Sequence, residues 1–205
     1  MNKKLDWLNI ARTLQSIGQT GLTFTEDWHD IERYQELLNI SSEIIANISD
    51  LDRNKIVLDF KNQKGYATPK IDIRGAILKD NKILLVQEME DKLWCLPGGW
   101  ADIGESPSEA IKREILEETG LKVSVENIIG IYDANKDGRD LSLYHAYKIV
   151  FLCESISGEL KTSNETIAVD YFEQNNIPEL STSRTHSRHL DDIYKYLNNK
   201  ITMFD

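Results

Sequence analysis

The sequence predicts an α/β domain, in which a mixed sheet lies between helices, preceded by a small all-helical domain. Three observations support this fold class. Apolar residues within residues 1–60 recur at helical spacing, whereas from Ile71 onward they follow the alternation of strands. Within the strand-rich part, Pro107 to Thr119 carries the start and stop signals of a single helix.

The first 60 residues predict two long amphipathic helices and a short one. Apolar residues three or four positions apart space the first helix, and we expect Gly18 or Gly21 to end it. Thr25 is expected to cap the second helix, whose apolar positions continue to Ile48. A short third helix is expected within residues 50–60.

A polar stretch with glycine and proline, residues 61–69, predicts a linker. We therefore expect a helical domain over residues 1–60, the linker, and a second domain over residues 70–205. The apolar stripes of the helical domain need a partner surface, because a segment of about 60 residues is marginally stable by itself.

The second domain is expected to begin with a hairpin, because strand-like runs flank a two-residue Asp80-Asn81 turn. A third, short run leads into Gly98 and Gly99, where the backbone can approach a ligand closely. A charged loop over residues 133–140 separates two later strands. The expected strands are residues 71–78, 82–86, 93–96, 123–132 and 141–153, followed by a terminal helix at 191–197.

The residues at the two ends of Pro107–Thr119 explain why a helix forms there. Ser106 can cap the free amides, proline suits the first helical position, and Glu109 completes a capping box. Gly120 suits the left-handed conformation that ends a helix.

Three glutamates share one side of this helix. Glu114, Glu117 and Glu118 are spaced i, i+3 and i+4, beside the apolar edge. Like charges at these spacings repel, and Arg113 can neutralise one carboxylate but not three. The simplest interpretation is that the three glutamates form a solvated acidic face with no function. The alternative is a site for hard divalent cations that prefer oxygen ligands, Mg²⁺ or Mn²⁺.

The surrounding residues match a known motif, the Nudix box. The matching residues are Gly99, Glu105, Arg113, Glu114, Glu117, Glu118 and Gly120, with apolar Ile115 and Leu121. The chain therefore resembles a Nudix hydrolase over about residues 71–198, which implies the Nudix α/β/α sandwich. The helical segment resembles that of a bacterial Nudix subgroup acting on nucleoside diphosphates linked to another group, including CDP-choline pyrophosphatases.

The resemblance implies attack of water on a pyrophosphate that joins a nucleoside to a second group. Acids cannot bind a pyrophosphate directly, so they must act through Mg²⁺ or Mn²⁺. Glu114 and Glu118 are then the principal metal ligands, with Glu117 shared or in the outer shell, and the Gly98 carbonyl adds an oxygen. The residues that the resemblance assigns to holding the loop and the helix in position are Glu105 and Arg113.

Four residues outside the box are candidates for further roles. Glu165 is the candidate general base, and Glu118 is the alternative candidate for that role. Glu165 could instead be an ordinary surface acid with no catalytic role. Arg74 could bind a substrate phosphate or serve as a salt-bridge partner in the fold. Tyr144 could stack on a base or pack in the sheet, and Arg184 could reach a phosphate or lie in solvent.

Composition narrows the classes of partner. The 205 residues carry a formal net charge of −10, which argues against generic nucleic-acid or anionic-membrane binding. No apolar run has the length of a membrane span and no signal peptide is expected, so we expect a cytoplasmic protein. Cys95 and Cys153 are expected to be reduced core residues. His186 and His189 lack a third ligand, and we expect them on the surface.

The leading hypothesis is a metal-dependent pyrophosphohydrolase of a CDP-choline-like nucleoside diphosphate derivative, giving a nucleoside monophosphate and a phosphorylated second group. The enzyme alternatives are an ADP-ribose pyrophosphatase and an RNA-directed nuclease or pyrophosphohydrolase; the acidic balance weighs against RNA without excluding it. A different class is a non-catalytic Nudix ligand sensor, which is expected to lose box acids. Resemblance to dimeric relatives favours a homodimer whose interface includes the helical segment.

Overall fold

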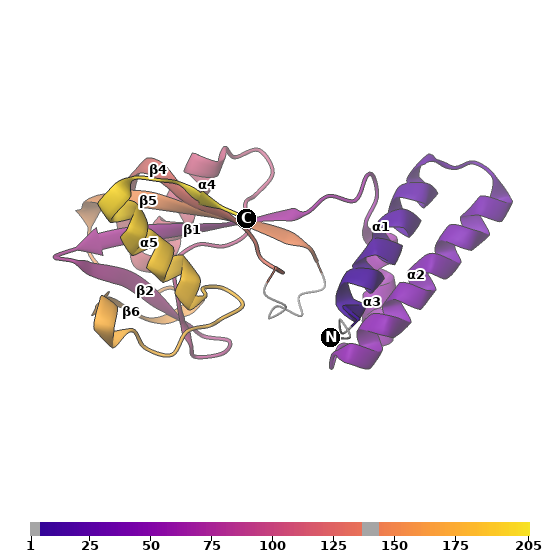
Figure 1. Cartoon of the computed structure of the whole chain (residues 1–205), viewed down its shortest axis with the longest axis horizontal. Helices are drawn as coiled ribbons and strands as arrows, with labels where there is room; N and C mark the ends of the chain where they lie inside the picture. The colour runs from indigo at the N-terminus through magenta and orange to yellow at the C-terminus, as the bar shows by residue number, and fades with distance from the viewer. Residues whose placement is uncertain (1–4, 137–143) are drawn as a thin grey trace. The chain divides into compact units, whose positions relative to one another are not determined.

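The structure is a computed structural model that describes residues 5–136 and 144–205. The chain divides into two compact units (Figure 1). The helical unit extends to Pro69 and takes in Tyr144 and His145, and the sheet unit begins at Lys70 and contains the remaining described residues. Each unit has its own apolar core. No helix within the described ranges combines the length and the apolar character that a membrane crossing requires.

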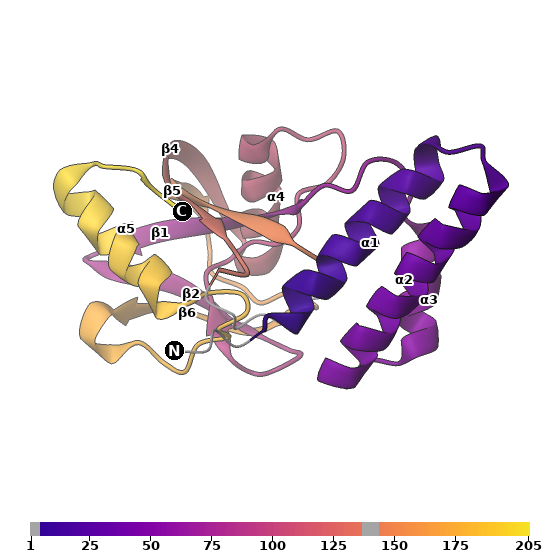
Figure 2. The same cartoon turned by 45° about the vertical axis from the view of Figure 1, so that its right-hand side comes forward.

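The described residues of the helical unit form three helices: α1 (Trp7–Phe24), α2 (Trp28–Ile48) and α3 (Arg53–Asn62), which lie side by side in Figures 1 and 2. Each helix begins behind an aspartate whose carboxylate accepts backbone amides, namely Asp6, Asp27 and Asp52. The expected Thr25 cap of α2 is therefore wrong. Thr25 instead ends α1, where its backbone N–H donates to the Gly21 carbonyl.

The sequence predicts that Gly18 or Gly21 ends α1, and this prediction is wrong. Both glycines lie inside α1, where it meets α2. A Cβ on Gly18 would lie 2.8 Å from Cδ2 of Leu38, and a Cβ on Gly21 would lie 2.5 Å from the ring of Tyr34. The missing side chains let the two helices approach closely. Tertiary packing therefore overrides the stop signal.

Within the described ranges, the sheet unit forms one sheet of seven strands and two α-helices. These are β1 (Lys70–Lys79), β2 (Lys82–Glu88), β3 (Trp94–Cys95), α4 (Pro107–Thr119), β4 (Leu121–Asp133), β5 (Ala146–Gly158), β6 (Thr166–Glu173), α5 (Ser187–Asn199) and β7 (Met203–Phe204). The strand order is β3-β2-β1-β5-β4-β7, with β6 paired to β2. β1 runs antiparallel to β2 and parallel to β5, so the sheet is mixed, as predicted.

The two helices of the sheet unit pack on opposite faces of the sheet. Leu84 and Leu85 are neighbours on β2, and neighbouring strand residues point to opposite faces. Leu84 shares a core with Ile115 of α4, whereas Leu85 shares the second core with Ile193 of α5. The predicted α/β/α sandwich is therefore confirmed.

The predicted hairpin forms, and several boundaries move. Asp80 and Asn81 adopt positive φ angles of 52° and 62°, as a two-residue hairpin turn requires. The terminal helix begins at Ser187 rather than at residue 191, because His186 caps it. β6 and β7 are not among the expected strands. β5 begins at Ala146, and the rest of the expected loop and strand at 137–143 lies outside the described residues.

Candidate active site

α4 begins and ends where its sequence signals predict. The Ser106 hydroxyl accepts the backbone amide of Glu109 at 3.3 Å, and the Glu109 carboxylate accepts the backbone amide of Ser106 at 2.9 Å. These two bonds complete the capping box. Gly120 has a φ of 75°, and its N–H donates to the Leu116 carbonyl. The two ends fix the helix rotation that buries Ile115 against the sheet.

The three glutamates of α4 differ in burial. Glu118 is 4% exposed, the Glu114 side chain is 12% exposed, and the Glu117 side chain is 58% exposed. The helix therefore turns one carboxylate inward, holds one at the boundary and leaves one in solvent. Glu114 and Glu118 are the two enclosed carboxylates of this helix.

Arg113 contacts more acids than the sequence predicts. Its guanidinium lies 3.0 Å from Glu105, 2.9 Å from Glu114 and 3.1 Å from Glu117. Asp102 is a further ion-pair partner at 3.4 Å. The hydrogen bonds to Glu105 are the largest cause of a raised Arg113 pKa. One guanidinium therefore neutralises two helix glutamates and ties the preceding loop to α4.

The glycine loop after β3 lies directly against the enclosed carboxylates. The Gly98 amide donates to Oε2 of Glu118 at 2.8 Å. Gly98 has a φ of 135°, and a Cβ there would lie 2.1 Å from the Ile73 carbonyl oxygen. A Cβ on Gly99 would lie 3.1 Å from Oε2 of Glu114. Gly98 therefore requires glycine, and a side chain at Gly99 would crowd the Glu114 carboxylate.

Burial sets the protonation of the inner carboxylate. It raises the pKa of Glu118 to about 8, and the positive charge of Arg74 opposes this rise. Burial also raises the pKa of Glu114. Glu118 therefore favours its protonated form at neutral pH unless a cation compensates its charge.

The donor set fits a hard divalent cation. Carboxylate and carbonyl oxygens are the ligands that Mg²⁺ and Mn²⁺ prefer, and Glu114, Glu118 and the Gly98 carbonyl supply that chemistry. A Cβ on Gly99 would lie 3.1–3.2 Å from the Glu114 carboxylate atoms, so glycine at this position keeps these oxygens uncrowded. Among the described residues, no three His, Cys, Asp or Glu side chains converge as a complete cluster of ligands. Cation binding would release the Glu118 proton.

Arg74 belongs to a buried ionic network. It donates to Asp72 at 2.8 Å and to the Leu96 carbonyl at 3.1 Å. The buried amine of Lys148 donates to Asp72 at 2.7 Å and to the Arg184 carbonyl at 2.6 Å. These contacts of Arg74 are those of a salt-bridge partner, and its role toward a substrate phosphate stays a prediction. The sequence pattern does not predict that Lys148 is buried in this network, because a lysine on a strand normally faces solvent.

Acids at the end of β2 and in the segment that follows it hold Arg184. Its guanidinium pairs with Asp91 at 3.0 Å, with Glu88 at 3.4 Å and with Glu90. Glu88 also accepts the thiol of Cys95 at 3.2 Å, so this buried carboxylate connects β3 to Arg184. The sequence offers one signal that could have identified Glu88 as a residue of this site, which is its position at the end of an apolar run. A contact between Arg184 and a substrate phosphate stays a prediction.

The two remaining candidates lie in different units. Glu165 is exposed and directly precedes β6, where the Thr166 hydroxyl donates to the Glu118 carbonyl at 3.1 Å. The turn that carries Glu165 is thereby tied to the C-terminal end of α4. Tyr144 belongs to the helical unit, where its hydroxyl donates to Asp59 at 2.9 Å. The roles expected for Glu165 and Tyr144 stay predictions.

The histidine pair starts α5. His186 caps the helix, and its backbone amide donates to Nδ1 of His189 at 3.1 Å. His189 is buried, and burial lowers its pKa to about 3. The expectation that both histidines lie on the surface is therefore wrong for His189.

Comparisons with known proteins cover both units. Residues 69–192 match the family model of the NUDIX domain, and residues 5–58 match that of a UDP-X-like, N-terminal oligomerisation domain. The chain is similar to the putative ADP-ribose pyrophosphatase YjhB of Bacillus subtilis (strain 168), with 38% identity over 201 residues and 97% of each chain covered. An ADP-ribose pyrophosphatase of Methanocaldococcus jannaschii is 35% identical over 144 residues, which cover 68% of this chain and 82% of that protein. The crystal structure of a UDP-X diphosphatase is 33% identical, with a TM-score of 0.65 and 98% of each chain covered.

We expect Gly98→Ala to lower the free energy of unfolding, measured by urea denaturation. A side chain at positive φ costs about 1–3 kcal/mol in strain alone, and the contact with the Ile73 carbonyl adds to that cost. Gly104→Ala is the matched control, because Gly104 also has a positive φ of 97° but a Cβ there meets nothing within 4 Å. Equal losses in the two variants would show that the close approach at Gly98 has no energetic importance.

Proposed function

The chain belongs to the Nudix hydrolase family and is a pyrophosphohydrolase of that family, and from this premise we propose that it cleaves the pyrophosphate of a nucleoside diphosphate linked to a sugar, with ADP-ribose as the leading candidate. The observation that carries this proposal is the similarity, over nearly the whole chain, to a putative ADP-ribose pyrophosphatase and to a UDP-X diphosphatase. Resemblance of the helical segment alone favours a CDP-choline-like substrate. The whole-chain similarity favours the ADP-ribose alternative.

Nudix hydrolases are generally dependent on divalent metals, and we infer Mg²⁺ or Mn²⁺ as the cofactor here. Glu114 and Glu118 would hold the cation, with the Gly98 carbonyl as a further oxygen ligand and Glu117 in the outer shell. A bound cation neutralises charge on the pyrophosphate and lowers the pKa of the attacking water. The amide of Gly98 keeps one oxygen of Glu118 in a fixed position.

We propose different roles for the three arginines of this region. Arg113 and Glu105 are positioning residues, because their mutual hydrogen bonds hold the loop beside α4. The Arg184 side chain is 24% exposed, against 6% for Arg74, and Arg184 is our candidate for a contact with a substrate phosphate. Arg74 is enclosed, and its positive charge stabilises the ionised form of Glu118.

We assign the role of general base to Glu165, with Glu118 as the alternative. Glu165 is open to water, and Thr166 ties its turn to the backbone of Glu118. Glu118 is enclosed and would already be engaged in holding the cation. A separate acid that is open to water therefore suits proton removal from the attacking water.

The proposed reaction predicts phosphomonoester products from ADP-ribose, detected as phosphate after treatment with a phosphatase. We expect a higher kcat/KM for ADP-ribose than for CDP-choline, and loss of turnover when the metal is chelated. Glu118→Gln should lower kcat by orders of magnitude, because it removes the enclosed anionic oxygen, whereas Glu117→Gln, on the exposed side chain, should lower it less.

Two results would contradict this proposal. Faster hydrolysis of CDP-choline would return the substrate assignment to that class. Near-normal kcat of Glu118→Gln at saturating Mg²⁺ would remove Glu118 from the metal site.

If Glu165 is the general base, the Glu165→Gln variant should lose kcat. General bases typically contribute about 10²–10⁴-fold, so we expect kcat to fall within that range at the optimal pH. Glu154→Gln, at an exposed position of β5, is the control and should keep normal kcat. A loss of less than about threefold would assign proton removal to Glu118 instead.

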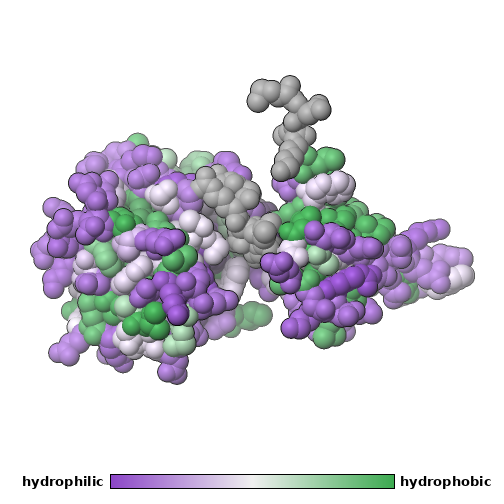
Figure 3. Space-filling view, turned by 90° about the horizontal axis from the view of Figure 1, so that it is seen from below, coloured by the Kyte–Doolittle hydropathy of each residue, from purple (hydrophilic) through white to green (hydrophobic). Residues whose placement is uncertain are grey.

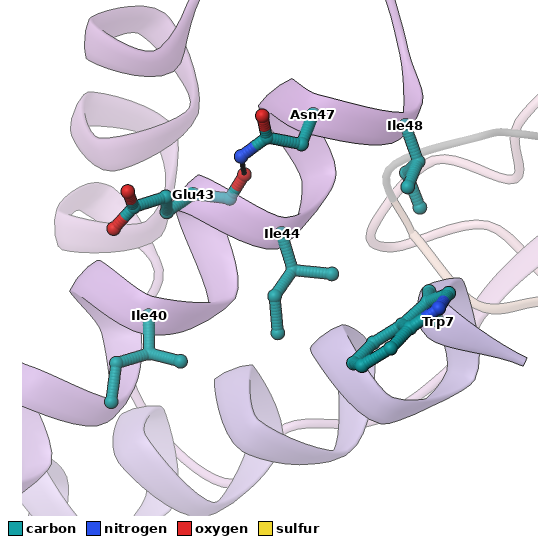
Figure 4. Close-up of a pocket in the computed structure, with 6 residues that line it drawn as sticks. All are labelled: Trp7, Ile40, Glu43, Ile44, Asn47 and Ile48. Carbon is teal, nitrogen blue, oxygen red and sulfur yellow. Dashed lines mark hydrogen bonds between the residues drawn. The ribbon is translucent and has the colours of Figure 1, made fainter. Parts of the chain in front are cut away.

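The helical unit carries an apolar groove that suits a second copy of the chain. A cavity of about 340 Å³ is lined by Trp7, Ile40, Glu43, Ile44, Asn47 and Ile48 (Figure 4). Trp7 is 49% exposed and Ile40 is 40% exposed, and Figure 3 shows apolar surface on this unit beside polar surface. The match to an N-terminal oligomerisation domain supports an oligomer, and we infer a homodimer that buries this groove.

The groove predicts that Ile40→Asp dissociates the homodimer, because a charge would be buried at the interface. Light scattering at micromolar concentration should give the mass of a dimer for the wild type and of a monomer for the variant. Leu58→Asp, at an exposed apolar position of α3 outside the groove, should remain a dimer. A monomeric wild type would contradict the homodimer, and the apolar surface of the helices would then have to be covered within the same chain.

A further inference from the structure

The helical unit contains a second, larger pocket, distinct from the apolar groove. Residues of all three helices and of the segment after α3 line this cavity of about 550 Å³. That volume falls within the range of small-molecule sites, roughly 300–1,000 Å³. Leu38 and Phe60 form its apolar floor, and both belong to the buried core of the unit.

The charges around this pocket are of one sign. Lys61 and Lys64 line it, and among the described residues that line it none is aspartate or glutamate. The whole chain has 34 acidic residues against 24 basic ones, so a cavity of this size without an acid departs from the general balance. Neither lysine forms an ion pair with another described residue. The pocket is therefore suited to an anion.

Uncharged polar groups complete the lining. Gln35 and Asn39 lie one turn apart on α2, and their side-chain amides make no hydrogen bond within the described part of the chain. The opposite wall is already fixed, because Gln19 donates to the Gly65 carbonyl at 3.1 Å and the Gly65 amide donates to the Thr23 hydroxyl at 3.0 Å. These bonds hold the segment that carries Lys64 against α1.

We propose that this pocket binds a small phosphomonoester, of the size of a mononucleotide or a sugar phosphate, at a site separate from the Nudix centre. The two lysines would contact the phosphate, the free amides would hydrogen-bond the polar part of the ligand, and the apolar floor would pack against its ring. A cation is the wrong ligand for two lysines, and a purely apolar ligand would make no use of the amides that line the pocket. The proposal does not rest on the substrate of the Nudix site, although that reaction releases products of this class.

Isothermal titration calorimetry on the full-length protein in EDTA tests the site, with AMP, ribose 5-phosphate and inorganic phosphate as probes. We expect one saturable site per chain for AMP or ribose 5-phosphate, and weaker binding of inorganic phosphate, which cannot use the floor. The double variant Lys61→Gln/Lys64→Gln should bind about tenfold or more weakly, because it loses the charge-assisted hydrogen bonds. Lys55→Gln, on α3 but outside the pocket, should bind as the wild type does.

Several outcomes would overturn the proposal. If the wild type binds no probe at millimolar concentration, the pocket is not a site for this class of ligand. If the double variant binds the probe as tightly as the wild type does, the probe binds at another site. Urea denaturation and light scattering of the double variant exclude misfolding as the cause of lost binding. If the double variant instead changes the mass of the protein and the wild type binds no probe, a second copy occupies the pocket. Hydrolysis of ADP-ribose is measured separately, so failure of this site leaves the proposed function standing.

Discussion

The site that we propose for catalysis depends on one carboxylate, Glu118, being held out of water against the backbone amide of Gly98. Burial disfavours its charge, and a single amide hydrogen bond cannot fully compensate for lost hydration. The side chain stays there because Ile111 and Ile115 of the same helix are fully buried in the core, which fixes the rotation of α4. Burial therefore favours the protonated form of this carboxylate, and a bound cation would favour the ionised form.

Positive charge reaches the site's acids from two directions, and each arginine is also tied to other acids. Arg113 connects the helix to the preceding loop through Glu105, whereas Arg74 lies in the sheet and is bound by Asp72. Lys148 extends the inner network, since it bridges Asp72 and the backbone of Arg184. Buried ionic groups of this kind cost desolvation energy and contribute defined geometry, so the network is better understood as positioning than as stabilisation.

Local signals predicted the parts of the fold whose geometry is set by neighbours in sequence. The capping box at Ser106 and the turn at Asp80 are such signals, and both appear in the structure. β1 and β2 also form as strands, but their residues are buried in continuous runs rather than in alternation, because apolar cores cover both faces of the sheet. Contacts between distant segments were not predictable from spacing. Glycines inside α1 end no helix because α2 packs on them, and the inward direction of Lys148 follows from partners on other segments. The box residues could be found because the motif is local, whereas Glu88 joins the site through Cys95 and Arg184, which lie on other strands and loops.

The close packing of α1 on α2 also explains why the helical unit presents two different surfaces. Gly18 and Gly21 let Leu38 and Tyr34 fill the space between the helices, so that part of the apolar stripe is satisfied within the unit. Trp7 and Ile40 remain exposed, and apolar area of this kind favours another protein surface. The second pocket combines a buried floor with lysines and free amides, which a protein interface of apolar character would leave poorly paired. We therefore assign the first surface to oligomerisation of residues 5–58, and the second suits a ligand with negative charge.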